Sequence, residues 1–161
     1  MPATLPADLV AMMARGVSVI VGSRDAKLRP SIMRAVGSRV EQDGQDITVY
    51  LSRPSSRQVL QDIASTGQLA VVFSEPSTHR TVQLKASRAE IRSAVADDVP
   101  VLAAYLKSME HEIQQVGIPP PLTRAMLAHR IEDVVAISFV PEQAFDQTPG
   151  PRAGEPLGAK P

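Results

Sequence analysis

A short polar loop between an alternating segment and an amphipathic segment is the stretch of this sequence best suited to bind an anion. Residues 47–52 read ITVYLS, the alternation of apolar and polar side chains that is typical of a half-buried β-strand. Pro54 ends this strand, and Ser55 or Ser56 can then cap a helix that begins near Arg57. A serine hydroxyl, an arginine and the free amide groups of a first helical turn together favour phosphate binding.

Arg57 is the residue of this loop that most needs an explanation. A cation at the start of a helix is disfavoured, because the free N–H groups and the helix macrodipole already place positive charge there. A bound phosphate would remove that repulsion. A second interpretation stays open, in which Ser56 is an ordinary cap and Arg57 is solvated. On local spacing alone, this second interpretation describes the commoner situation.

Composition places the chain among ordinary globular proteins. Its 161 residues suit a single domain with a real core, and 43% of them are hydrophobic. Seventeen acidic and seventeen basic residues give no net charge, which disfavours a nucleic-acid or anionic-membrane partner. The absence of cysteine excludes disulfides and thiolate chemistry and is compatible with a cytoplasmic location. We expect neither a secretion signal nor a membrane span.

The order of elements predicts a mainly β protein with peripheral helices. Alternating or β-branched segments predict six strands, at residues 17–21, 31–40, 47–52, 69–73, 81–92 and 134–140. Amphipathic segments predict four helices, between Pro6 and Gly16 and at about residues 57–66, 99–116 and 122–130. In the second helix, Val59 and Ile63 are expected inside and Asp62 in solvent. The strand at residues 81–92 needs a bulge near residues 86–89, and long bending strands allow small barrels to close.

The C-terminal segment differs in composition from the rest of the chain. Residues 1–146 are expected to form one domain, with a helical excursion at about residues 97–130. Residues 147–161 read QTPGPRAGEPLGAKP, which is rich in Gly and Pro and nearly empty of core-forming residues. We do not expect this tail to fold by itself. It is either a frayed end, the commoner situation, or an arm that packs on a partner subunit.

Three short motifs, found in the right order on the right elements, resemble the pyridoxamine 5'-phosphate oxidase-like family of FMN-binding split barrels. The strand after RDAKLRP, from Met33 to about Ser38, matches the family's flavin-contacting strand. Tyr50-Leu51 followed by Ser56-Arg57-Gln58 is similar to the family's Tyr-Thr followed by Ser-Arg-Lys, and Arg80-Thr81-Val82 resembles its Arg-Gln-Val. The resemblance implies a six-stranded antiparallel split β-barrel and a homodimer with the flavin at the subunit interface.

The resemblance also implies FMN as the cofactor and a set of residues that contact it. These expected contacts are Met33, Arg34, Ala35, Val36, Tyr50, Leu51, Ser52, Ser56, Arg57, Gln58 and Thr81. It indicates no catalytic residue. It also implies no metal ligand.

The sequence departs from the family pattern at charged positions. Met33 stands where the family has a phosphate-binding Arg, and Arg34 lies one place on, so the two side chains point to opposite faces of a strand. Gln58 replaces the family's Lys, which keeps a hydrogen-bond donor and removes a charge. Trp is absent, as is a C-terminal Arg/His cluster that would bind the vitamin phosphate. We therefore do not expect pyridoxamine 5'-phosphate oxidation.

Two classes of function remain. In the first, an FMN-dependent oxidoreductase passes electrons between a reductant and a small acceptor. In the second, the barrel is a non-catalytic module that holds a flavin or a haem. His79, His111 and His129 are far apart in sequence and predict no metal site, and hydrolase and nucleotide-binding motifs are absent. We expect a homodimer, because the barrel is too small to enclose a flavin and residues 134–140 are strongly apolar.

Overall fold

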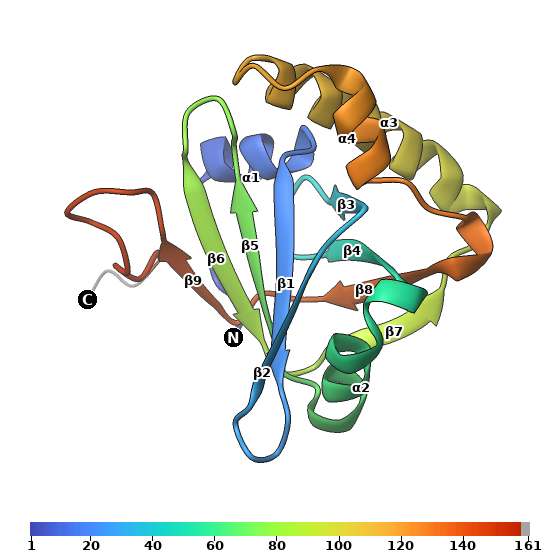
Figure 1. Ribbon diagram of the computed structural model, residues 1–161. Helices are drawn as coiled ribbons and strands as arrows, with labels where there is room; N and C mark the ends of the chain where they lie inside the picture. The colour runs from blue at the N-terminus through green and yellow to red at the C-terminus, as the bar shows by residue number, and fades with distance from the viewer. Residues whose placement is uncertain (159–161) are drawn as a thin grey trace.

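The computed structural model describes residues 1–158 and contains two antiparallel sheets (Figure 1). The five-stranded sheet has the order β2-β1-β5-β6-β9, with bounds Pro30–Arg34, Ser18–Arg24, Leu69–Ser74, Thr81–Ala86 and Gln143–Asp146. The four-stranded sheet has the order β3-β4-β8-β7, with bounds Gly37–Val40, Ile47–Ser52, Val134–Phe139 and Glu90–Ser93. The α-helices are α1 Ala7–Ala14, α2 Arg57–Thr66, α3 Val99–Gln114 and α4 Pro120–Met126.

The mainly β class with peripheral helices is confirmed, but the described residues form nine strands where six were expected. The expected strand at residues 31–40 is divided between the two sheets. The Ala35 N–H donates to Val19 O of β1, whereas the Val36 N–H donates to Tyr50 O of β4. The expected strand at residues 81–92 is likewise divided into β6 and β7. β9 was not expected, because its four residues carry too short an alternation to be recognised.

The core lies between the inner faces of the two sheets. Val71 and Phe73 of the five-stranded sheet and Val49, Val135 and Ile137 of the four-stranded sheet are all fully buried in one cluster. In β5 the alternation of buried and more exposed residues follows the two-residue period of a strand, whereas in β4 Val49, Tyr50 and Leu51 are all buried. β8 is an exception, because it lies between β4 and β7 and is buried along nearly its whole length.

Helix α2 packs beside β1 and β2 and follows β4 through the loop where the anion site was predicted. Val59 and Ile63 are buried as expected. Asp62 is also buried, contrary to the expectation, because Ser31 of β2 and Gln58 donate hydrogen bonds to its carboxylate. Gly67 ends the helix with a positive φ of 69°, and a Cβ there would lie 2.5 Å from the Ser87 carbonyl oxygen.

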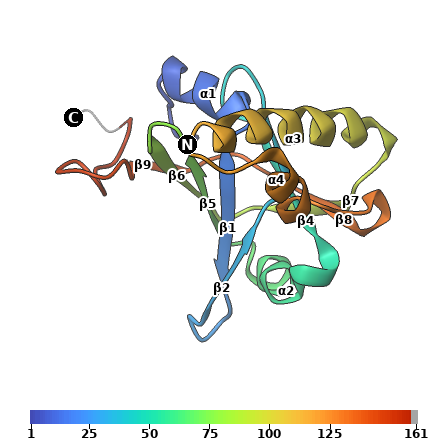
Figure 2. The ribbon, with the colours of Figure 1, turned by 45° about the horizontal axis from the view of Figure 1, so that its top comes forward.

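Helices α1 and α3 lie at the opposite end of the barrel from α2 (Figures 1 and 2). Tyr105 of α3 is buried and donates to Val17 O, which fixes the helix above the start of β1. Helix α4 begins at Pro120 and ends at Met126, earlier than the expected residues 122–130, because a proline suits the first turn of a helix. No helix within residues 1–158 is both long and apolar enough to cross a membrane.

Candidate cofactor site

The N-terminus of α2 contains a buried hydroxyl without a partner. A 3₁₀ turn at Arg53–Ser55 leads from β4 into the helix, and Ser56 follows with only 1% of its surface exposed. Its backbone is used, since the Ser56 N–H donates to Arg53 O and Ser56 O accepts from the Leu60 N–H. Its Oγ makes no hydrogen bond within residues 1–158 and does not cap the helix. A buried polar atom left unpaired is costly, so a ligand that reaches it gains that energy.

Three more donors lie at the same helix end. In the described part of the chain, the backbone N–H groups of Arg57, Gln58 and Val59 have no protein acceptor, as is usual for a first turn without a side-chain cap. The Arg57 side chain is exposed, and so is that of Arg53 in the preceding turn. The two arginines therefore make this helix end cationic and open to solvent, whereas the Ser56 hydroxyl itself is buried. The donor set matches the geometry in which helix N-termini hold phosphate.

Gln58 is held away from a direct ligand role. Its Nε2 donates to Asp62 Oδ1 at 2.9 Å, and Asp62 Oδ2 accepts from Ser31 Oγ at 2.6 Å. This chain of contacts ties the first turn of α2 to strand β2. Asp62 is 3% exposed and has no cationic partner among the described residues, so it depends on these two neutral donors. Gln58, which stands at the family's Lys position, is thus engaged in a structural hydrogen bond.

The predicted contacts on the first matching strand are only partly accessible. Met33 is half-buried against the core, and Ala35 and Val36 are buried. Arg34 points to the outer face of the five-stranded sheet, where its Nη1 donates to Ser18 Oγ at 2.7 Å. β2 is an edge strand, and the pairing of Ala35 with Val19 leaves the backbone groups of Arg34 facing away from β1. A ligand beside this strand would therefore contact its backbone edge.

Tyr50 belongs to a satisfied internal network. Its ring is fully buried, and its hydroxyl donates to Asp98 Oδ1 at 2.8 Å. The same carboxylate accepts two hydrogen bonds from Arg92, at 2.7 and 2.9 Å, and one from the Val95 N–H. Arg92 holds the pKa of Asp98 well below its usual range, and burial raises the pKa of Tyr50 to about 12. The Tyr50 side chain is therefore inaccessible to a cofactor.

The remaining predicted contacts do not all meet in one chain. Leu51 is fully buried, and Ser52 lies at the start of the anion loop, where its carbonyl accepts from Ser55 Oγ. Thr81 is on the outer face of β6, bonded to Ser74 and His79. Figures 1 and 2 place that end of β6 far from α2. Within a single chain, the predicted contacts at residues 52–58 lie together at the start of α2, and Thr81 is distant from them.

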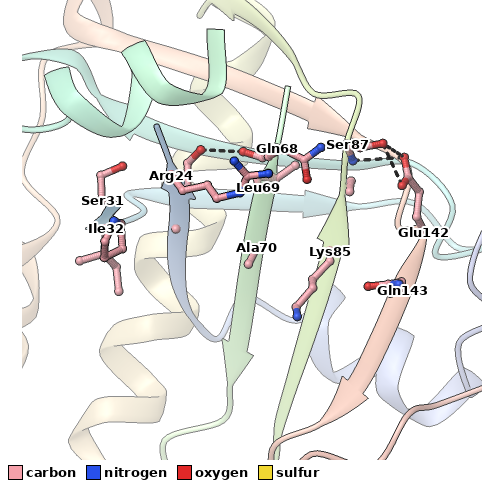
Figure 3. Close-up of a pocket in the computed structure, with 14 residues that line it drawn as sticks. Arg24, Ser31, Ile32, Gln68, Leu69, Ala70, Lys85, Ser87, Glu142 and Gln143 are labelled. Carbon is pink, nitrogen blue, oxygen red and sulfur yellow. Dashed lines mark hydrogen bonds between the residues drawn. The ribbon is translucent and has the colours of Figure 1, made fainter. Parts of the chain in front are cut away.

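A groove that the sequence did not predict lies on the outer face of the five-stranded sheet. It has a volume of about 800 Å³ and contains none of the predicted contact residues. Its floor is formed by small residues on neighbouring strands, Gly22 and Ala70, which pair in register. Figure 3 shows Ile32 at one side and Lys85 at the other, with Arg24, Gln68, Ser87 and Glu142 along one rim. The small residues Gly22 and Ala70 were the sequence signal for this groove, but only the pairing of β1 with β5 places them side by side.

Comparison with known proteins identifies the fold. No protein-family model matches the sequence, and no curated protein matches it. Among solved structures, a protein described as a candidate pyridoxamine 5'-phosphate oxidase from Lactobacillus delbrueckii has 15% identity, a TM-score of 0.56, and coverage of 90% of this chain and 99% of its own. An F420 reductase has 13% identity, a TM-score of 0.59, and coverage of 87% and 98%. HutZ, the haem storage protein from Vibrio cholerae, has 12% identity, a TM-score of 0.50, and coverage of 86% and 92%.

The chain has the pyridoxamine 5'-phosphate oxidase-like split-barrel fold. The resemblance expected from its motifs is confirmed at the level of fold. These similar split barrels are named for different ligands, so the choice of ligand depends on the residues of this chain.

The histidines of this split barrel are dispersed. His79 and His111 are exposed, and His129 Nδ1 contacts Leu127 O. Within residues 1–158, no group of three or more His, Cys, Asp or Glu residues could hold a metal ion. None of the residues that line the groove is a His, Cys, Met or Tyr, the usual axial ligands of haem iron. By contrast, the donors at the start of α2 suit the phosphate of a flavin nucleotide.

Proposed function

We propose that this split barrel is an FMN-binding flavoprotein that holds the FMN phosphate at the N-terminus of α2. The observation that carries this proposal is the Ser56 hydroxyl, which is buried and unpaired beside Arg57 and three free amides. A phosphate accepts hydrogen bonds from all these groups and neutralises the positive helix end. Gln58 takes no direct part, because Asp62 holds its amide.

The proposed activity is that of an oxidoreductase acting on a small electron acceptor. When bound, the isoalloxazine supplies the electron-transfer chemistry, and the chain supplies binding and orientation. The residues that would do this are Ser56 and Arg57 at the phosphate and the open backbone edge of β2 beside the ring. A non-catalytic flavin-binding module is the alternative. Turnover of bound flavin by a reductant and an acceptor distinguishes the two.

We further propose that the site is completed in a homodimer. Thr81 and the groove lie on a sheet face that no helix covers within residues 1–158, and Ile32 on that face is 69% exposed. Apolar residues in that position favour burial against a second copy. The earlier reason, apolar residues 134–140, does not hold, because β8 lies inside the four-stranded sheet. Light scattering tests this, and a monomer at micromolar concentration would contradict it.

The phosphate site is tested by comparing FMN with riboflavin, which lacks the phosphate. We expect Arg57→Ala to weaken FMN binding by about 1.5 to 3 kcal/mol, roughly 10- to 150-fold, the range for hydrogen bonds to charged groups. Riboflavin should bind the wild type and the variant equally. Arg124→Ala is the matched control, because it removes an exposed arginine from α4, where Arg124 pairs with Glu110. Equal FMN affinity in Arg57→Ala and the wild type would refute the site.

A further inference from the structure

The C-terminal segment folds back along the outer edge of β9. The chain reverses after Thr148, and residues 154–157 then run antiparallel to β9 (Figure 1). The Gly154 N–H donates to Asp146 O at 2.7 Å, and the Asp146 N–H donates to Glu155 O at 2.9 Å. The Leu157 N–H donates to Ala144 O at 2.8 Å. We call residues 154–157 the strap.

The hydrogen bonds of β9 show what the strap covers. Residues 143 and 145 of β9 face β6, and the flanking Gln147 N–H donates to Thr81 O at 2.9 Å in the same pattern. Ala144 and Asp146 therefore point their backbone groups away from the sheet. The strap satisfies both backbone groups of Asp146 and the carbonyl of Ala144. Without it, the last strand of the five-stranded sheet would present unpaired groups to solvent.

The strap is anchored at both ends. Before the reversal that leads into it, Thr148 Oγ1 accepts from the Thr81 N–H at 3.0 Å and so holds the chain against β6. At its end, the Leu157 side chain packs against the main core. Gly158 then passes close to the N-terminal segment, where a Cβ would lie 2.8 Å from Thr4 O.

The strap also presents a poor edge of its own. Because Glu155 and Leu157 bond to β9, the backbone nitrogen of Pro156 between them lies on the outward side. Proline has no N–H, so this position cannot donate to a further strand. The adjacent Arg152 and Glu155 are charged and exposed. Both features are ways in which natural sheets prevent pairing at an edge.

We propose that the edge of β9 is a self-association surface and that the strap seals it against β9 of a second copy. The proposal does not involve the phosphate site, since none of the residues 147–158 belongs to the α2 loop. It does touch the face of the expected flavin contact Thr81, because Thr148 accepts from the Thr81 N–H. It accounts for the Gly and Pro content of the tail, because Gly permits the reversal and Pro156 blocks further pairing. Residues 159–161 of the predicted tail lie outside the described residues.

The first test removes residues 149–161 and keeps Thr148 with its contact to β6. We expect an unchanged far-ultraviolet circular dichroism spectrum. The weight-average mass from light scattering should rise to about twice that of the full chain as concentration increases from about 10 to about 200 µM. A peptide of residues 152–158, added in excess, should reverse this rise. An assembly state identical to that of the full chain at every concentration would overturn the proposal.

A second variant keeps the whole tail and decides the question if truncation impairs folding. Leu157→Pro removes the N–H that donates to Ala144 O and weakens the core anchor. We expect it to associate as the truncated chain does. Arg130→Ala, which removes an exposed ion pair with Glu132 outside the tail, is the control and should behave as wild type. A folded Leu157→Pro variant without increased association would refute the sealing role.

Discussion

Tyr50 and Ser56 lie on either side of the same turn, yet the structure gives their hydroxyl groups opposite surroundings. Both are buried. The Tyr50 hydroxyl is bonded to Asp98, which is bonded in turn to Arg92 and the Val95 N–H. The Ser56 hydroxyl has no partner within the described residues. The motif resemblance treats the two residues alike, as cofactor contacts.

The difference shows how burial separates structural from functional polar groups. A buried group whose hydrogen bonds are satisfied stabilises the fold and has nothing left to offer a ligand. A buried group without a partner costs stability in the free protein and recovers that cost when a ligand arrives. Changes to the Tyr50 network should therefore alter stability, and changes at Ser56 should alter binding.

The largest expected effect is on the stability of the Tyr50 network. Asp98→Ala leaves the Tyr50 hydroxyl and the Val95 N–H without an acceptor and Arg92 without its partner. We expect the free energy of unfolding to fall by about 2 to 4 kcal/mol, with the Arg92 share reduced because its side chain is 47% exposed. Urea denaturation measures this loss. The FMN affinity of the variant, measured under conditions where it is folded, should match that of wild type. A specific loss of FMN binding would contradict the purely structural role of the Tyr50 network.

Acidification should lower the free energy of unfolding through the same network, by a smaller amount. The pKa of Asp98 in the folded protein lies below its ordinary value of 3.8, so folding favours the ionised carboxylate. This contribution is complete above about pH 5 and is lost as the pH falls through and below the ordinary value. Wild type should lose about 1 kcal/mol more than Asp98→Asn between about pH 5 and pH 3. Urea titrations of both proteins at these pH values measure the difference. Equal losses of unfolding free energy in the two proteins would contradict the expectation.

Substitution of Ser56 tests the other side of the comparison. Ser56→Ala removes a buried hydroxyl that bonds to nothing in the free chain, so the free energy of unfolding should not fall and should rise by up to about 1 kcal/mol. FMN binding should weaken by about 1 kcal/mol, roughly fivefold, because the phosphate loses one donor. Fluorescence titration measures the affinity. Ser55→Ala is the control, since the exposed Ser55 hydroxyl already donates to Ser52 O.

The smallest expected effect is at Gln58. Its amide serves Asp62 and not the proposed phosphate, so Gln58→Ala should change FMN affinity by less than about 0.5 kcal/mol. A modest loss of stability should accompany it, because Asp62 then keeps only Ser31 as a donor. A loss of FMN affinity as large as that of Arg57→Ala would show that Gln58 binds the phosphate directly.

Much of this protein was predictable from local sequence. The strand at residues 47–52 and the helix at residues 57–66 depend on alternation and amphipathic spacing that act over a few positions, although the predicted serine cap is not formed. The motif order predicted the split-barrel fold, which the comparison with solved structures confirms. Arg57 was placed correctly in the first turn of α2.

Tertiary structure alone decided how polar groups are shared between distant segments. Tyr50 meets Asp98, and Asp62 meets Ser31, because the packing of α3 and α2 on the barrel brings them together. The division of the long strands at Ala35 and Ala86 likewise depends on which sheet offers the next backbone partner. Local propensity cannot encode these choices, since every buried N–H, hydroxyl and carboxylate takes the partner that packing places within reach. The Ser56 hydroxyl is one of three buried side-chain hydroxyls in the described residues to which packing supplied no partner, with those of Ser38 and Thr123.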